Sequence, residues 1–167
     1  MAQPSGGSEG ISEYGVKAAF LYKFVHFVEW PPQAFGEAST PFTIGILGED
    51  PFGRTLDDAV QGKTISGRPL VVRRFASPRE VEACQLLFIS RSVEPMLGRA
   101  LESAGATGVL TVSDIDEFAR RGGVIELLVV QNTVRFDVNL ATAERAALRL
   151  SSKLLNVAHA VIDEPQP

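Results

Sequence analysis

Short apolar runs alternate with helical stretches through most of the chain, and this alternation restricts the possible folds more than any other feature. The four predicted strands are Phe42–Leu47, Leu70–Phe75, Leu86–Ile89 and Gly108–Val112. Strands that alternate with helices form parallel sheets with helices packed on both faces. The pattern therefore predicts an α/β protein made of a single Rossmann-like domain with three layers.

Capping residues mark the starts of the helices between these strands. Aspartate and serine side chains accept hydrogen bonds from the first free N–H groups of a helix, and proline fits its first turn. The predicted helices begin at Asp50-Pro51, Ser77-Pro78, Ser92 and Ser113-Asp114. The second is expected to be short, and the others end near Val60, Ala104 and Arg121. Gly105 and Gly122 are typical of positions just past a helix end.

The pattern then changes to two consecutive strands, Val124–Val130 and Thr133–Val138. Only Gln131-Asn132 separates them, which predicts an antiparallel hairpin at the C-terminal edge of an otherwise parallel sheet. Asn139 is the predicted cap of a final helix, because apolar residues recur at helical spacing over Leu140–Val161.

A first helix is predicted from Ser12 to about Val28, where Trp30-Pro31-Pro32 ends it. Apolar residues cover most of the circumference of this helix, so we expect it to be buried on several sides. Lys17 and Lys23 are expected to bury their stems and keep their ammonium groups in solvent.

The predicted domain covers residues 12–162. Residues 1–11 are small and polar and are expected to be flexible, and residues 163–167 are expected to form a disordered tail. Ala2-Gln3 is compatible with the start of a mature exported protein or with a natural cytoplasmic start. Charged residues interrupt the apolar stretch 16–30 too often for a membrane span, so no membrane insertion is expected.

The balance of charge excludes a general nucleic-acid binder. The 167 residues include 16 basic and 20 acidic ones, for a net charge of −4, and no basic stripe is present. A single cysteine, Cys84, excludes an internal disulfide and a cysteine-rich zinc site. We expect a buried, inert thiol there, and no cofactor or metal.

No catalytic constellation is present in the sequence. The glycines after the first strand do not form a dinucleotide-binding motif, and Glu49 and Asp50 would repel a phosphate there. Asp114, Asp116 and Glu117 follow the fourth strand, at the edge where open sheets often bind ligands. One interpretation of these acids is a magnesium or general-base role, and the other is stabilisation of a first helical turn.

The hairpin is the candidate recognition element. Its expected core face consists of Ile125, Leu127, Val129, Val134, Phe136 and Val138. Centring the turn pairs Leu128 with Arg135 and Glu126 with Asp137 on the opposite face. Aliphatic and charged side chains around one arginine are typical of a recognition surface, although a face half-buried under another element is the alternative. We hypothesise that Glu126, Leu128, Val130 and Arg135 bind a partner.

Several motifs resemble one known family. Residues 13–30 read Glu-Tyr-Gly-Val-Lys-Ala-Ala-Phe-Leu-Tyr-Lys-Phe-Val-His-Phe-Val-Glu-Trp, and Pro31 follows. Later motifs are Gly108-Val-Leu-Thr-Val-Ser-Asp114, Asn132-x-Val-Arg-Phe136 and Ser151-Ser152-Lys153-Leu154-Leu155. Over roughly residues 12–160 the chain resembles the YfiR-like family of bacterial periplasmic proteins.

The resemblance implies a regulator without enzymatic activity. Family members are typically exported, which favours a mature N-terminus at Ala2 and a periplasmic location. The partner implied by the resemblance is a membrane-bound diguanylate cyclase, whose periplasmic sensory part is bound so that cytoplasmic catalysis is held off. The implied result is less cyclic-di-GMP and less biofilm. No catalytic, cofactor-binding or metal-binding residue is implied.

Other functions remain open from the residues alone. A periplasmic small-molecule sensor would have its pocket near Glu49, Asp50 and Asp114, and the short distance from the first helix to Trp30 also leaves room for a ligand. An enzyme would use the acids of Asp114–Glu117. An apolar edge hairpin is also compatible with a homodimer.

Overall fold

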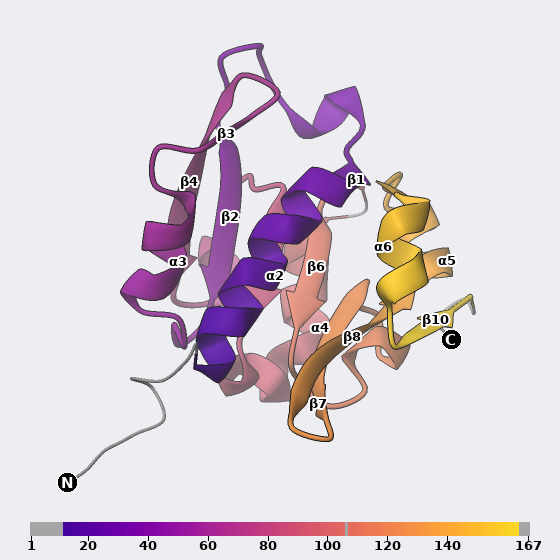
Figure 1. The fold of residues 1–167 in the computed structure, drawn as a ribbon. Helices are drawn as coiled ribbons and strands as arrows, with labels where there is room; N and C mark the ends of the chain where they lie inside the picture. The colour runs from indigo at the N-terminus through magenta and orange to yellow at the C-terminus, as the bar shows by residue number, and fades with distance from the viewer. Residues whose placement is uncertain (1–11, 106, 164–167) are drawn as a thin grey trace, which may run out of the picture.

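An eight-stranded sheet organises the structure, a computed structural model that describes residues 12–105 and 107–163 (Figure 1). The strand order is β10-β8-β7-β6-β5-β2-β4-β3. The strands are β2 (Phe42–Leu47), β3 (Thr64–Ile65), β4 (Arg68–Phe75), β5 (Leu86–Ile89), β6 (Leu110–Ser113), β7 (Ile125–Val130), β8 (Thr133–Asn139) and β10 (Ala160–Ile162). Neighbours from β4 to β7 are parallel, and β7 and β8 are antiparallel. The predicted, mostly parallel sheet is confirmed.

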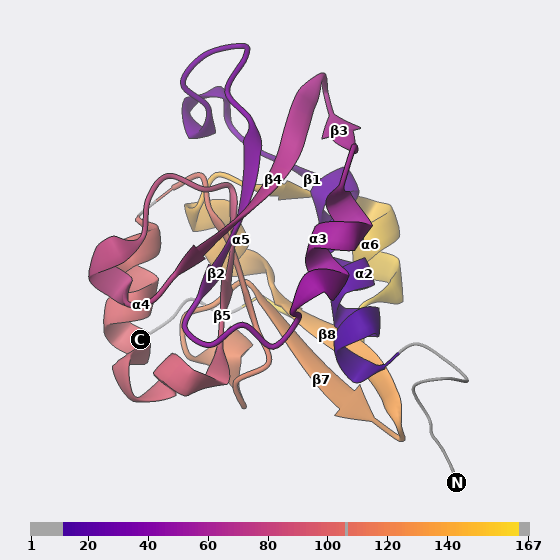
Figure 2. The ribbon, with the colours of Figure 1, turned by 90° about the vertical axis from the view of Figure 1, so that its left-hand side faces the viewer.

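Helices cover both faces of the sheet (Figure 2). Helices α2 (Glu13–Phe27), α3 (Arg54–Val60) and α6 (Ser152–Val157) lie on one face, and α4 (Leu97–Ala104) lies on the other. The 3-10 turns η2 (Pro78–Glu80) and η3 (Arg91–Met96) pack beside α4. Strand β5 alternates between the two cores: Leu86 and Phe88 face α2, whereas Leu87 and Ile89 face α4. The predicted three-layer α/β class is therefore confirmed.

The predicted flexible segment at residues 1–11 lies outside the described residues. Residues 164–167 of the predicted tail lie outside them as well. The remaining elements are β1 (Val28–Glu29), η1 (Pro32–Ala34), η4 (Phe118–Arg120), α5 (Leu140–Arg145) and β9 (Arg149–Leu150).

Two predicted helices are only single 3-10 turns. The segment after Ser77 forms η2, and the segment after Asp116 forms η4. Ser113 donates to the Ile89 carbonyl at 2.5 Å and accepts from the Ile115 N–H at 3.0 Å, so it closes a tight turn instead of starting a long helix. Glu117 follows with φ +63°, which takes the chain off the helical path.

The prediction of one long final helix is wrong. Helix α5 ends at Arg145, and Ala147 has φ +64°. Strand β9 then pairs with β1, and Ser151 caps α6 by accepting from the Lys153 N–H at 3.0 Å. A helix gains little stability from its own residues, whereas pairing with β1 and β8 satisfies backbone groups across the fold. Tertiary pairing therefore overrides the helical spacing of Leu140–Val161.

Strand β10, not the hairpin, occupies the edge of the sheet. It pairs in parallel with residues 137–139 of β8, and β6 pairs only with Ile125 and Glu126 of β7. Within the described part of the chain, residues 127–130 and 133–136 have only each other as strand partners, although the Phe136 carbonyl also accepts from the His159 N–H at 2.7 Å. This part of the hairpin, which we call the arm (residues 127–136), projects past the sheet (Figures 1 and 2).

The register of the hairpin agrees with the prediction. Leu128 lies opposite Arg135, and Glu126 lies opposite Asp137. Gln131 and Asn132 have φ values of +51° and +66°. Both residues are left-handed, as a type I′ turn requires. A two-residue turn without glycine therefore sets the register of the arm.

The contact between Gly123 and Phe118 allows a test of the packing. A Cβ atom at Gly123 would overlap the ring of Phe118, which is fully buried. We expect Gly123→Ala to lower the free energy of unfolding in urea by about 1–3 kcal/mol, because the ring has no free space to move into.

Gly98→Ala is the matched control. Gly98 lies in α4, and nothing lies within 4 Å of a Cβ atom there. This substitution should be neutral or should stabilise the protein by up to about 1 kcal/mol. If both variants lowered the free energy of unfolding by the same amount, the described packing around Phe118 would be contradicted.

Candidate functional site

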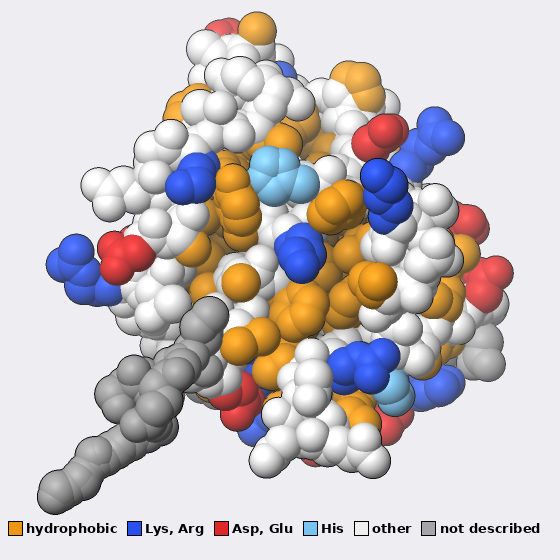
Figure 3. Space-filling view, in the orientation of Figure 1, with side chains coloured by type: hydrophobic (Ala, Val, Ile, Leu, Met, Phe, Trp, Pro, Cys, Tyr) orange, Lys and Arg blue, Asp and Glu red, His pale blue; other side chains and the backbone are white. Residues whose placement is uncertain are grey.

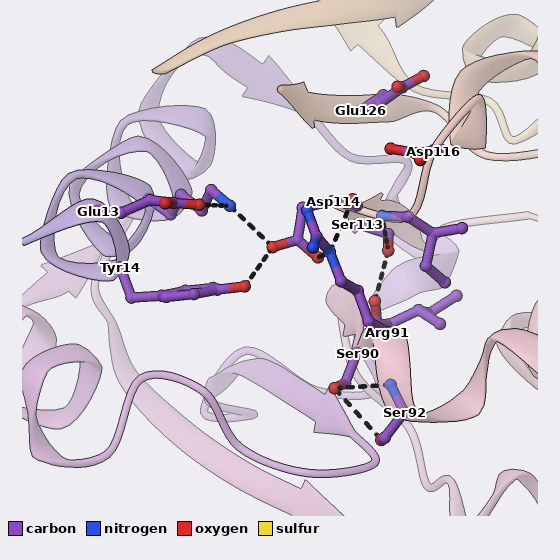
Figure 4. Close-up of polar contacts among 12 residues, drawn as sticks. Glu13, Tyr14, Ser90, Arg91, Ser92, Ser113, Asp114, Asp116 and Glu126 are labelled. Carbon is purple, nitrogen blue, oxygen red and sulfur yellow. Dashed lines mark hydrogen bonds and ion pairs between the residues drawn. The ribbon is translucent and has the colours of Figure 1, made fainter. Parts of the chain in front are cut away.

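The carboxyl ends of β2, β5 and β6 meet at one edge of the sheet. The chain crosses from β2 to β4 on one side and returns to β5 on the other, and ligands of open α/β sheets bind at such a reversal point. Glu49, Asp50, Arg91 and Asp114 follow these strands. The N-terminal half of α2 packs against this edge, so its side chains reach Asp114 (Figure 4).

Lys17 is buried, contrary to the prediction from the sequence. Its ammonium group was expected in solvent, but the residue is 0% exposed. Lys17 Nζ lies 2.8 Å from Asp114 Oδ2 and 2.6 Å from Glu13 Oε2. Tyr14 donates a hydrogen bond to the same Asp114 oxygen at 2.5 Å. A buried lysine needs a carboxylate partner, and this one lies 97 positions away, where no local pattern announces it.

Asp114 is an ionised carboxylate with its charge balanced. Burial alone would raise the pKa of Asp114, but the hydrogen bonds from Lys17 and Tyr14 and the charges of Lys17 and Arg91 outweigh burial and hold that pKa below its ordinary value. Arg91 Nε lies 3.3 Å from Asp114 Oδ1. Burial and the hydrogen bond to Asp114 raise the pKa of Tyr14. Neither group is therefore poised to take a proton from a substrate near neutral pH.

The other acids at this edge do not converge on Asp114. Asp116 and Glu126 lie apart from it in Figure 4. Asp50 accepts from the Phe52 N–H at 2.8 Å and pairs with Arg74 at 2.8 Å. Among residues 12–105 and 107–163, no group of three or more histidine, cysteine or acidic side chains is placed to hold a metal ion. Asp114 therefore anchors α2, a role that the sequence did not suggest, and the turn after it is not the start of a long helix.

The four predicted partner-binding residues lie on the arm and at its base. Glu126 accepts from the backbone N–H groups of Glu117 and Ala119 at 3.1 and 3.2 Å, so it holds η4 against the hairpin. Burial, together with the nearby charge of Asp137, raises the pKa of Glu126. Leu128, Val130 and Arg135 are half-buried. Their role in partner binding stays a prediction.

The opposite face of the arm is less buried than expected. Leu127 and Phe136 belong to the core, and the ring of Phe136 packs on Phe20 and Phe24 at centroid distances of 5.7 and 5.2 Å. Val129 was expected beside them but is 50% exposed. The arm projects past the sheet, so its tip lies beyond the elements that cover its base.

A cleft of about 380 Å³ opens at the other edge of the sheet, near the amino ends of β2 and β4. Its aromatic lining includes Trp30, Phe35 and Phe42. The Trp30 indole N–H donates to the Gln85 carbonyl at 2.7 Å, and the Arg68 guanidinium lies 4.0 Å from the centroid of the Phe35 ring. The sequence suggested room near Trp30, but not this combination with β2 and β4.

Cys84 is the buried thiol that the sequence predicted. It lies in the core on the α4 side of the sheet. Burial raises its pKa to about 12, so the reactive thiolate is scarce at neutral pH.

Comparison with known proteins places the chain in a family. A family model described as YfiR/HmsC-like matches residues 14–159. The chain belongs to the YfiR/HmsC-like family. The predicted resemblance is confirmed, and membership supports a periplasmic regulatory role in cyclic-di-GMP signalling in general terms. The family is regulatory and non-enzymatic. Within the described residues, no helix is both long and apolar enough to span a membrane.

Similarity to other proteins is confined to the fold. No curated protein matches the chain. One similar solved structure is titled an ABC domain in complex with L-Trp from Streptococcus pneumonia, with 12% identity and a TM-score of 0.53. The match covers 72% of this chain and 56% of that one. The chain thus spans little more than half of that structure, and the likeness shows the α/β fold alone.

The buried ion pair predicts a strong effect of Asp114→Asn. This substitution leaves the ammonium of Lys17 buried with only Glu13 as counter-charge, so we expect the free energy of unfolding to fall by about 3 kcal/mol. The double variant Lys17→Met/Asp114→Leu should recover most of this loss, because no unpaired charge stays buried. Urea unfolding at pH 7 measures both effects.

The pH dependence follows from the lowered pKa of Asp114. Its stabilisation is complete above its unfolded pKa, about 3.9, and is lost as the pH falls through the lower folded pKa. The wild-type advantage over Asp114→Asn should therefore shrink only below about pH 4. Asp58→Asn breaks an exposed pair with Arg54 and is the control, with an expected change under about 0.5 kcal/mol. If Asp58→Asn and Asp114→Asn lowered the free energy of unfolding by similar amounts, the buried pair would not stabilise the fold as described.

Proposed function

We propose that this protein is a periplasmic regulator that binds the periplasmic sensor region of a membrane-bound diguanylate cyclase and represses it, which lowers cyclic-di-GMP and biofilm formation. The match of residues 14–159 to the YfiR/HmsC-like family carries this proposal. The internal partners of Asp114 and Asp50 accord with it, because both carboxylates are already used within the fold.

Repression of this kind needs only differential binding. A regulator that binds the inactive state of the cyclase better than the active state shifts the equilibrium toward the inactive state. A shift from 99% active to 99% inactive takes about 5.5 kcal/mol of differential affinity. One protein interface of standard size supplies binding energies in this range.

The arm is the contact that we propose for the cyclase. A two-stranded hairpin alone has marginal stability in water, and proteins usually cover exposed strand edges. The outer strand edges of residues 127–130 and 133–135, with the aliphatic side chains of Leu128 and Val130 beside Arg135, therefore favour a covering partner. Glu126 contributes by holding the base of the arm against η4.

The double variant Leu128→Ala/Arg135→Ala tests the arm. In cells that lack the native gene, the wild-type protein should lower cyclic-di-GMP, and this variant should restore it toward the level of the deletion strain. Loss of two interface anchors should weaken binding of a solubilised cyclase at least about tenfold. The melting temperature should stay nearly unchanged, because both side chains are only half-buried.

The matched control is Arg99→Ala/Leu101→Ala on α4, which removes the same residue types from an element outside the arm. It should repress like the wild type. A large fall in melting temperature for the arm variant would show that this face belongs to the core. Unchanged cyclic-di-GMP on deletion of the gene would contradict the repressor function.

The aromatic cleft favours a second function, that of a small-molecule sensor. Trp30, Phe35 and Phe42 line a concave site of the kind that binds small ligands, with Glu29 and Arg68 as polar neighbours. A small aromatic compound fits this lining, because three aromatic rings are available to pack against it.

Trp30 is the only tryptophan, so its fluorescence reports on the cleft. Titration with a panel of small aromatic compounds should give a saturable change in fluorescence for at least one of them. Phe35→Ala should weaken binding of that compound about tenfold, because the substitution removes one aromatic wall of the cleft. A response of equal affinity in Phe35→Ala would show that the compound binds elsewhere.

A further inference from the structure

Helix α2 keeps large apolar side chains that are only partly covered, beside an exposed stripe that includes Lys23 and His26. The inner side is buried and includes Ala18, Leu21 and Phe24. Phe20 and Phe27 are only half-buried, although they belong to the same apolar helix. A helix that is apolar on all sides is normally covered on all sides. The structure therefore leaves part of this apolar surface for another molecule.

Three hollows lie along this side of α2. The first, of about 540 Å³, separates α2 from the arm and is lined by Phe20 and Val129. The second, of about 220 Å³, separates α2 from α6 and is lined by Phe27 and Val157. The third, of about 400 Å³, shares Phe27 and Lys153 with the second. We call this row of hollows the α2 groove, and Figure 3 shows apolar side chains across this face.

The groove contains unusually exposed apolar side chains. The described residues with large, exposed apolar side chains are Met96, Val129, Val157 and Val161. Val129 and Val157, which are 50% and 60% exposed, both line the α2 groove. Single exposed valines need no explanation, but two in one hollowed apolar face are typical of an interaction site.

Cations without ion-pair partners border this apolar surface. Lys23 and Lys153 line the second hollow, and neither forms an ion pair with any described residue. Two carboxylates are near the ends of the groove: Glu13 already pairs with Lys17, and Glu29 lies opposite Arg149 in the pairing of β1 with β9. Although the chain has a net charge of −4, Lys23 and Lys153 form a local cationic rim beside the apolar floor of the groove.

We propose that the α2 groove binds an acidic amphipathic helix of the partner protein, so this inference rests on the proposed function. Helix α2 has 15 residues, so the groove beside it is about 22 Å long, the length of about four turns of a bound helix. Apolar residues of that helix fill the hollows at i, i+3, i+4 and i+7, and its carboxylates meet Lys23 and Lys153.

The charges and the shape of the face disfavour other occupants. A second copy of this chain related by a two-fold axis would bring two copies of the same cationic patch into one interface. A lipid surface is flat, whereas this face is hollowed along α2. A partner helix with carboxylates satisfies both the apolar floor and the cationic rim.

Two labelled peptides test the groove with the full chain. Each is an 18-residue fluorescein-labelled helix with leucines at i, i+3, i+4 and i+7, flanked by glutamates in one peptide and by lysines in the other. Fluorescence anisotropy should show at least about tenfold tighter binding of the glutamate peptide. Lys23→Glu/Lys153→Glu should abolish or reverse this preference.

Arg79→Glu/Arg99→Glu is the matched control, because it makes the same change in charge at exposed arginines of η2 and α4, away from the groove. This variant should keep the preference for the glutamate peptide. Equal binding of the two peptides, or equal effects of the two double variants, would overturn the proposal.

Two other outcomes would overturn it in favour of another occupant. A dimer in sedimentation that dissociates in Lys23→Glu/Lys153→Glu would assign the groove to a second copy. Displacement of the glutamate peptide by phosphatidylglycerol vesicles, with no displacement by phosphatidylcholine vesicles, would assign it to an anionic lipid surface. A monomer that binds the glutamate peptide in the presence of both kinds of vesicle supports the proposal.

Cyclic-di-GMP levels in cells separate this inference from the proposed function. If Lys23→Glu/Lys153→Glu represses as well as the wild type, the groove is not the partner site, although the repressor function stands. If the wild type itself does not alter cyclic-di-GMP, the repressor function fails. The peptide measurements then still decide whether the groove takes an acidic helix.

Discussion

The buried pair of Lys17 and Asp114 determines how α2 sits on the sheet. Because α2 is apolar on nearly all sides, burial of apolar area does not by itself select one rotation of the helix about its axis. A lysine 0% exposed must meet its carboxylate, and only one rotation brings Lys17 to Asp114. A buried ion pair is weak evidence for stability but is well suited to specify one arrangement. The aromatic contact with the arm and the outward-facing groove both depend on that rotation.

Features set by neighbouring residues were predictable from the sequence. The alternation of strands and helices led to the three-layer fold, and the two-residue turn at Gln131 and Asn132 led to the register of the hairpin. The inert thiol of Cys84 followed from its place beside an apolar strand. In each case the decisive residues lie within a few positions of one another, so the local pattern carries the information.

Features set by distant residues were not predictable. The carboxylate partner of Lys17 lies 97 positions away, so its buried ammonium looked like an ordinary surface lysine. The spacing of Leu140–Val161 suits a helix, yet pairing of β9 with β1 and of β10 with β8 decides the structure. Val129 alternates correctly for the core, but the arm extends beyond the elements that would cover it. The α2 groove combines such segments, and therefore no single motif indicates it.

The position of Cys84 has a consequence for handling the protein. The chain has one cysteine, and the sulfur is buried with a pKa raised to about 12. The protein can therefore reach its native state without pairing of thiols and without protection of a reactive thiol. Oxidising and reducing buffers should yield the same folded molecule, and covalent crosslinking through sulfur should not complicate the study of its assemblies.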